Sequence, residues 1–334
     1  MQLRRVTLFG GSGFIGRHLV KRLAERGATL RVAVRDPERA LFLTPMGDVG
    51  QIVPVRADVT VEEETRAALE GADAAVNLVG ILYERGRQRF AEVHHRGAER
   101  VAQAATSLGV GRLVHVSAVG ADARSESDYA RTKGEGEAAV RSQFPGATVV
   151  RPSVVFGPED DFFNRFAALA RVLPALPVFG CVPRLVVRGG VPTLDLWGSG
   201  GPKFQPVYVG DVAESIVRIL EQPATAGRTY ELGGPRVYSL KEIMALVLAE
   251  TRRRRPLVPL PIFVADIQAM VLGLLPRPPL TRDQVKLLRR DNVVASGTLG
   301  LADLGIEPAA VEAILPTYMD RFRVHGRWSG SESL

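Results

Sequence analysis

The chain has 334 residues, enough for one large domain with a smaller satellite. With 46% hydrophobic and 24% charged residues, its composition is that of a soluble globular protein and excludes a disordered or fibrous chain. The single cysteine, Cys181, excludes an intrachain disulfide, and no Cys/His cluster has zinc spacing, so we predict no metal site. Met1 is followed almost at once by an apolar strand, which leaves no room for a targeting peptide. We therefore predict a cytoplasmic protein, or one that lies peripherally on the inner membrane.

Strand-length apolar runs alternate with helix-length segments through the first half of the chain. The predicted strands lie near 6–10, 30–34, 51–55, 74–79, 113–117 and 147–152, and the predicted helices near 14–26, 61–70, 90–108 and 129–143. This alternation predicts an α/β fold, a doubly wound parallel sheet of the Rossmann type.

After Pro152 glycine and proline accumulate, and we expect loops and short strands through 181–202, a stretch to which we assign no role. Ser-x-x-Glu at 239–242 and Thr-x-x-Gln at 281–284 are capping boxes, which predict helices that begin at Ser239 and Thr281. We predict an NAD(P)-binding domain over 1–235, with substrate-side loops from 157, a smaller and mostly helical domain over 236–325, and a flexible tail at 326–334.

The net charge of +7 arises in one segment. Nine basic and two acidic residues lie between Arg252 and Arg290, and charge is balanced elsewhere. The segment contains an apolar stretch, Ile262 to Leu275, that is too short to cross a bilayer but suits an anionic membrane surface. The alternative is a buried helix beside a solvated arginine turn. We favour contact with a membrane or membrane protein, and we predict no nucleic-acid partner, because no basic face with interleaved aromatics is present.

A glycine-rich turn follows the first predicted strand. In LFGGSGFIG, Gly10, Gly13 and Gly16 stand between a strand and an amphipathic helix, where glycines let a pyrophosphate approach the helix N-terminus. The predicted cofactor-binding residues of this turn are Gly10, Gly11, Ser12, Gly13, Phe14, Ile15 and Gly16. The sequence therefore predicts a dinucleotide site.

The end of the second predicted strand indicates which dinucleotide is bound. The strand ends at Arg35, which suits a ribose 2′-phosphate, and Arg17 or Arg39 could assist. The alternative is that Asp36 accepts from the 2′-hydroxyl of NAD(H). We favour NADPH over NAD(H).

Four further residues are predicted to line the cofactor. Asp58 and Val59 would flank the adenine, and Val79 and Gly80 would pass beside the nicotinamide-side ribose, where glycine permits close approach. For each of these positions a plain turn is the alternative.

Tyr129 and Lys133 in SDYARTK stand four residues apart and share one helix face. A nearby ammonium favours phenolate, so we expect Lys133 to lower the pKa of Tyr129, as a general acid/base requires. Ser117, at the end of the fifth predicted strand, would hydrogen-bond a substrate carbonyl. Together with the glycine turn, these residues form a candidate catalytic site.

These motifs resemble the short-chain dehydrogenase/reductase superfamily in its extended, NAD-dependent epimerase/dehydratase branch. The resemblance implies that Tyr129 is the acid/base, that Lys133 binds the nicotinamide ribose, that Ser117 orients a carbonyl, and that Ser153 contacts the cofactor. RPSVVFGPEDDFFNRFA, QPVYVGDVAESI, PLTRDQVKLLRRDNVV and LADLGI resemble an atypical group that includes the NADPH-binding accessory subunit of respiratory complex I, NADH:ubiquinone oxidoreductase.

The second resemblance implies an accessory or assembly protein with a mainly structural NADPH and complex I subunits as partners. The alternatives are an active NADPH-dependent oxidoreductase or epimerase on a carbonyl or sugar-nucleotide substrate, and a membrane-associated enzyme on a quinone or other lipid-like substrate. One position departs from the extended branch, which often has Val-Asn-x-x-Gly where this chain has Val93-His94-His95-Arg96-Gly97. His94 could replace the asparagine as a polar group of the helix, but we expect it to lie at the surface.

Overall fold

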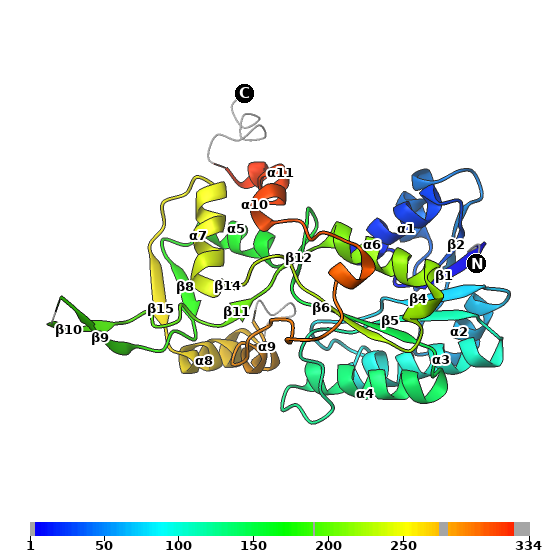
Figure 1. Ribbon diagram of the computed structural model, residues 1–334, viewed down its shortest axis with the longest axis horizontal. Coiled ribbons are helices and arrows are strands. Elements are labelled where there is room, and N and C mark those ends of the chain that lie inside the picture. The colour runs from blue at the N-terminus through cyan, green and yellow to red at the C-terminus, as the bar shows by residue number, and fades with distance from the viewer. Residues whose placement is uncertain (1–3, 190, 274–279, 324–334) are drawn as a thin grey trace. The chain divides into compact units, whose positions relative to one another are not determined.

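The computed structural model describes residues 4–189, 191–273 and 280–323 (Figure 1). The predicted tail at 326–334 and the end of the apolar stretch, Leu274 and Leu275, lie outside these residues. The chain forms two compact units, each built from separate segments. The first unit combines 1–152, 209–232 and 294–308, and the second combines 153–208, 233–293 and 309–334. Each unit therefore takes segments from both sides of the predicted boundary at 235.

The first unit is a parallel sheet with helices on both faces, as predicted (Figure 1). Its strands are β1 (Arg5–Phe9), β2 (Thr29–Val34), β3 (Ile52–Arg56), β4 (Ala74–Asn77), β5 (Arg112–Val116), β6 (Thr148–Pro152) and β13 (Thr229–Leu232). Its helices are α1 (Phe14–Glu25), α2 (Glu62–Leu69), α3 (Gly97–Ser107), α4 (Asp128–Gln143) and α6 (Val209–Glu221), with 3-10 turns η1 (Glu38–Met46), η3 (Pro223–Thr225) and η4 (Ala302–Leu304).

The strand order β13-β6-β5-β4-β1-β2-β3 places a topological switch point at β1. From β1 the chain proceeds to β2 and β3 on one side, and β4 pairs with β1 on the other. In open sheets of this kind, a crevice forms outside the carboxyl ends of the strands at the switch point. The turn after β1, which carries the glycines, lies at that place.

Because the sheet is buried on both faces, the sequences of these strands are nearly continuous runs of apolar residues. Leu8 and Phe9 of β1 and Val32 of β2 are fully buried, and the helices pack on them with aliphatic residues such as Leu19 and Val101. The helix predicted over 90–108 begins instead with a π-helical turn, η2 (Ala91–Arg96), which leads into α3. The π turn shifts the side chains of 91–96 relative to a regular helix.

The second unit holds short strands and helices. Its strands are β7 (Val155–Phe156), β8 (Leu176–Phe179), β9 (Arg184–Arg188), β10 (Val191–Asp195), β11 (Lys203–Phe204), β12 (Val207–Tyr208), β14 (Tyr238–Ser239) and β15 (Leu257–Leu260). Its helices are α5 (Phe163–Val172), α7 (Leu240–Glu250), α8 (Ile262–Leu272), α9 (Arg282–Leu287), α10 (Val311–Ile314), α11 (Pro316–Met319) and the 3-10 turn η5 (Asp320–Phe322). Phe156, Phe163, Leu176, Ile243 and Leu315 lie in its core.

Both predicted capping boxes are confirmed. The Ser239 side chain accepts from the amide of Glu242 at the start of α7, and the Thr281 side chain accepts from the amide of Gln284 at the start of α9. None of the helices in the described part of the chain is long and apolar enough to cross a membrane.

Candidate functional site

The glycine turn connects β1 to α1 and exposes the N-terminus of that helix. Gly10 has φ +78°, a conformation that favours glycine, and its amide donates to the carbonyl of Ala33 on β2. Gly13 is the N-cap residue of α1, has no side chain to occupy the free amides, and lies exposed. Open amides and the helix dipole at this place favour an anion.

Gly16 explains how the helix comes so close to the turn. A Cβ at Gly16 would lie 2.5 Å from the carbonyl oxygen of Gly11 and 2.6 Å from that of Gly10, so glycine is required there. Ser12, Phe14 and Ile15 are half-buried around the same turn. All seven residues predicted from the motif thus lie together in a cradle of backbone amides, and this cradle fits the diphosphate of a dinucleotide.

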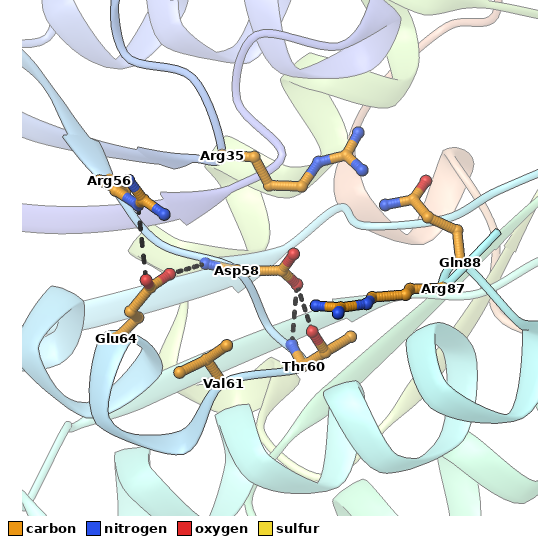
Figure 2. Close-up of a pocket in the computed structure, with 8 residues that line it drawn as sticks. All are labelled: Arg35, Arg56, Asp58, Thr60, Val61, Glu64, Arg87 and Gln88. Carbon is orange, nitrogen blue, oxygen red and sulfur yellow. Dashed lines mark hydrogen bonds and ion pairs between the residues drawn. The ribbon is translucent and has the colours of Figure 1, made fainter. Parts of the chain in front are cut away.

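A cavity of about 340 Å³ lies at the carboxyl ends of β2 and β3. It is lined by Arg35, Arg56, Asp58, Thr60, Val61, Glu64, Arg87 and Gln88 (Figure 2). Arg35 extends from the tip of β2 into this cavity, as the prediction of a 2′-phosphate contact requires. The Asp36 carboxylate instead accepts from the amide of Arg39 at 3.3 Å and pairs with its guanidinium at 3.7 Å.

The two arginines predicted to assist Arg35 do not line the cavity. Arg39 pairs with Asp36, and the Arg17 guanidinium lies 5.1 Å from the centre of the Phe42 ring. Arg87, which the sequence analysis did not single out, lines the cavity instead. Arg87 lies on the loop between β4 and η2. Nothing in the local sequence indicates that this loop approaches the end of β2.

Asp58 and Val59 play different parts at this end of the site. Asp58 lines the cavity, and its carboxylate accepts from the amide and the hydroxyl of Thr60 at 2.9 and 2.8 Å. The Val59 side chain is buried, and a Cβ at Gly97 would lie 2.9 Å from it. Val59 therefore packs against the start of α3, and only its backbone is available to a ligand.

The segment after β4 forms the wall at the other end of the crevice. The buried Asn77 side chain accepts from the amide of Val79 at 3.1 Å and so holds the segment in place. Val79 is half-buried and Gly80 is exposed. A Cβ at Gly80 would lie 3.4 Å from Lys133 Nζ, so this segment and the lysine are within contact distance of each other.

The three predicted catalytic residues lie in the same unit. Helix α4 begins after the N-cap residue Ser127 and carries Tyr129 and Lys133 on one face. Lys133 Nζ donates to the carbonyl of Val116, the residue before Ser117, at 3.1 Å. The Ser117 side chain is only 4% exposed, and its Oγ has no hydrogen-bond partner among the residues that the structure describes. A buried hydroxyl of this kind is available to a bound ligand.

The pKa of Tyr129 departs from the expected direction. Burial raises the pKa of Tyr129 to about 12, and the same cause lowers the pKa of Lys133 to about 8. The prediction that Lys133 lowers the tyrosine pKa is therefore wrong for this structure, because loss of hydration raises the pKa of Tyr129. The phenol is protonated near neutral pH.

His94 corrects a second expectation, since it is buried and not at the surface. Only 1% of it is exposed, and its Nε2 accepts from the amide of Ile81 at 3.0 Å. The proton therefore resides on Nδ1, which lies 3.2 Å from the hydroxyl of Thr132 on α4. Burial lowers the pKa of His94 to about 2, with a further contribution from Lys133. A neutral histidine thus connects the wall after β4 to the helix of Tyr129.

Aromatic packing joins the same elements. The His94 ring stacks on Phe90 at 5.3 Å between centroids, and both rings meet the Tyr129 ring edge-on. His115 of β5, also buried, has Nδ1 3.3 Å from the Asn77 amide, and burial lowers its pKa to about 3. The sequence signal for His94 was its place in the Val-Asn-x-x-Gly pattern, and no signal distinguished His115 from an ordinary strand residue.

Ser153, predicted to contact the cofactor, lies in the second unit. Its hydroxyl lies 2.6 Å from Oδ1 and 2.9 Å from the carbonyl oxygen of Asn292. The hydroxyl therefore has a structural partner in this unit, and a cofactor contact by Ser153 stays a prediction.

The model of the NAD dependent epimerase/dehydratase family matches residues 6–233, and the chain belongs to that family. It is 34% identical to the NADH dehydrogenase (ubiquinone) 1 alpha subcomplex subunit 9 of Mus musculus mitochondria, over 98% of this chain and 82% of the relative. It is also 32% identical to the mitochondrial NADH-ubiquinone oxidoreductase 40 kDa subunit of Neurospora crassa, over 95% and 79%.

Solved structures share the fold at low identity. The dTDP-glucose 4,6-dehydratase of Streptomyces venezuelae, solved with NAD bound, superposes with a TM-score of 0.68 at 19% identity, over 95% of this chain and 96% of that one. Both resemblances predicted from the motifs, to the epimerase/dehydratase branch and to the complex I subunit, are confirmed by these comparisons.

Proposed function

We propose that this protein is an accessory or assembly protein of a complex-I-type NADH:quinone oxidoreductase and that it holds an NADPH with a mainly structural role. The observation that carries this proposal is the extent of the likeness to the two complex I subunits. The family model ends at residue 233, but the likeness to the mouse subunit covers 98% of the chain. It therefore includes the part of the chain after residue 233, which the family model does not cover.

The choice of NADPH over NADH is supported by charge at the adenosine end. Arg35 stands at the strand tip, where the ribose 2′ substituent is recognised in this fold, and it reaches a cavity with room for a phosphate. Asp36, the residue that would accept from a 2′-hydroxyl, is already bonded to Arg39.

The nicotinamide would supply hydride chemistry if the site were active. On the protein's side, Lys133 would hold the adjoining ribose, Ser117 would donate to an acceptor oxygen, and Tyr129 would hold a proton at its phenol oxygen. The high pKa of Tyr129 suits a neutral phenol in a binding role. Because Ser117, Tyr129 and Lys133 are all present, there is one second candidate function. It is that of an NADPH-dependent oxidoreductase or epimerase acting on a carbonyl, sugar-nucleotide or quinone-like compound.

A surface of the second unit supports placement beside an anionic membrane. Helix α8 buries Ala265 and Ala269 against Val285 of α9, while its opposite stripe leaves Phe263, Ile267, Met270 and Val271 more than half exposed. Basic side chains at Arg282, Lys286, Arg289 and Arg290 are exposed on and just after α9. Apolar and cationic groups side by side are the features that bind an anionic bilayer surface.

Only part of the arginine run at 252–255 is free for such a surface. Arg253 and Arg255 are half-buried, and their guanidinium groups donate to the carbonyls of Phe322 and Ala170. Arg252 and Arg254 are exposed. The partner surface we propose therefore consists of α8 and α9, whereas Arg252 and Arg254 precede β15 and lie at the other end of that strand from α8 (Figure 1).

Replacing Tyr129 distinguishes the two candidate functions. For a structural cofactor, Tyr129→Phe should keep the bound nucleotide and shift the thermal midpoint by less than about 2 °C, because the ring contacts remain. For an enzyme, the same change should lower NADPH oxidation with a carbonyl or quinone by about 10²–10⁴-fold. Tyr83→Phe is the matched control, and a rate loss confined to Tyr129→Phe would overturn the accessory role.

A further inference from the structure

The cavity at the tip of β2 has a second cationic wall that the nucleotide fold itself does not provide. It comes from the loop between β4 and η2, in which Arg85 and Gln88 exchange two backbone hydrogen bonds of 3.0 Å around Gly86 and Arg87. Gly86 has φ +56°, as a tight two-residue turn of this type requires. The loop therefore has a defined shape and presents Arg87 at its tip.

The base of this turn is fixed to the rest of the site. The Glu84 carboxylate accepts from the amide of Phe90 at 2.8 Å and from the Arg89 guanidinium at 3.2 Å. Phe90 is buried in the aromatic cluster with His94 and Tyr129. The position of the turn is thus tied to the floor of the crevice.

The charges in the cavity leave two cations available. Arg56 pairs with Glu64 at 3.5 Å, and the Asp58 carboxylate is held by Thr60. Among the residues that the structure describes, the guanidinium groups of Arg35 and Arg87 have no hydrogen bond or ion pair. In Figure 2 they reach into the cavity from opposite sides, with Asp58 between them and the Gln88 amide beside them.

We propose that Arg87 is a second arginine for the ribose 2′-phosphate of the cofactor, opposite Arg35, and that it sets the preference for NADPH together with that residue. This inference rests on the proposed NADPH cofactor. A phosphomonoester offers several oxygens, so two guanidinium groups can each form charge-assisted contacts with it. Two arginines also offset the repulsion between the phosphate and the Asp58 carboxylate, which one arginine would leave in place.

The test isolates the adenosine end of the site. Nucleotide-free protein is titrated calorimetrically with adenosine 2′,5′-bisphosphate and with adenosine 5′-monophosphate, which differs only in lacking the 2′-phosphate. Arg87→Gln should weaken binding of the bisphosphate about tenfold and change binding of the monophosphate less than about twofold, as expected for loss of one hydrogen-bonded charge. Arg87→Lys, which keeps the charge but loses the planar fork, should fall between the wild type and Arg87→Gln.

Arg85→Gln is the matched control, because Arg85 belongs to the same turn but does not line the cavity. It should change both affinities less than about twofold. Equal losses of bisphosphate affinity in Arg85→Gln and Arg87→Gln would indicate a long-range electrostatic effect of the loop charges. That result would overturn the proposed contact between Arg87 and the 2′-phosphate. Unchanged discrimination in Arg87→Gln alongside a loss in Arg35→Gln would overturn the role of Arg87 but leave NADPH as the cofactor. A wild type that binds the two nucleotides equally well would overturn the NADPH proposal and this inference with it.

Discussion

Two histidines, His94 and His115, are buried beneath the crevice. Burial lowers the pKa values of His94 and His115, and the nearby charge of Lys133 lowers them further. Each is held by a neighbour, His94 by Ile81 and His115 by Asn77. Both rings are therefore neutral in the folded protein near neutral pH.

This neutrality predicts acid sensitivity. Below pH 6.5 each histidine takes up a proton in the unfolded chain that it does not bind when folded, so the free energy of unfolding falls as the pH falls from 6.5 toward 3. Each histidine contributes a slope of up to about 1.4 kcal/mol per pH unit. Urea titrations between about pH 5 and 6.5 should show a slope smaller by about that amount in His94→Gln and in His115→Gln. Parallel slopes in wild type and variants would contradict the assigned protonation states.

The residues at the two ends of the crevice differ in how far the sequence predicts them. Arg35 and the glycines were predictable because strand, turn and helix follow one another directly in the chain. Arg87 was not, since its place depends on a loop that returns to a strand tip some fifty residues earlier. The pKa of Tyr129 was not predictable either, because it depends on how completely Phe90 and His94 enclose the ring.

At the scale of elements, the first unit was predictable because its strands are buried on both faces. All six strands predicted in the first half are present within a few residues of their expected ends. The short strands expected in the stretch 181–202 are present as β9 and β10, but their pairing as a hairpin was not predicted; in it Leu185 pairs with Leu194 and both remain exposed. Because the apolar side chains of this hairpin are not buried on one face, the sequence pattern does not specify how its strands pair.

Helix α8 has an apolar stripe that is exposed on the second unit. Its exposed stripe includes Phe263, 59% exposed, and Ile267, 55% exposed. If this stripe enters a bilayer surface, Phe263→Gln with Ile267→Gln should weaken binding to phosphatidylglycerol-containing vesicles at least about tenfold, since burying each side chain contributes about 1.5–3 kcal/mol. Co-sedimentation measures the bound fraction, and the thermal midpoint reports folding.

The control for α8 is an equally apolar change elsewhere. Leu41 and Leu82 are exposed to a similar degree, at 54% and 51%, so Leu41→Gln with Leu82→Gln should leave vesicle binding unchanged. Equal losses in the two double variants would indicate nonspecific adsorption. A wild type that does not sediment with anionic vesicles at physiological salt would remove the membrane from the list of partners.

In the whole molecule, the two units hold different functional features. The first unit holds the glycine cradle, the arginine-lined cavity and the Tyr129–Lys133 pair, and the family model covers most of it. The second unit holds the exposed stripe of α8 and most of the basic excess, and the likeness to the complex I subunits extends through it. Sequence predicted a boundary near 235, whereas the compact units interleave along the chain, because strand β13 and helix α6 return to the sheet after the second unit has begun.

We propose that the nucleotide is a part of the structure and not a substrate in turnover. This is tested on protein purified without added nucleotide: the nucleotide released on denaturation is identified and counted, and its exchange and oxidation are then followed in the intact protein. We expect about one NADPH per chain that exchanges slowly and is not oxidised by carbonyl compounds or quinones. Protein that purifies empty, exchanges NADPH rapidly and oxidises it with such a compound would show that the cofactor turns over and that Tyr129 is a catalyst.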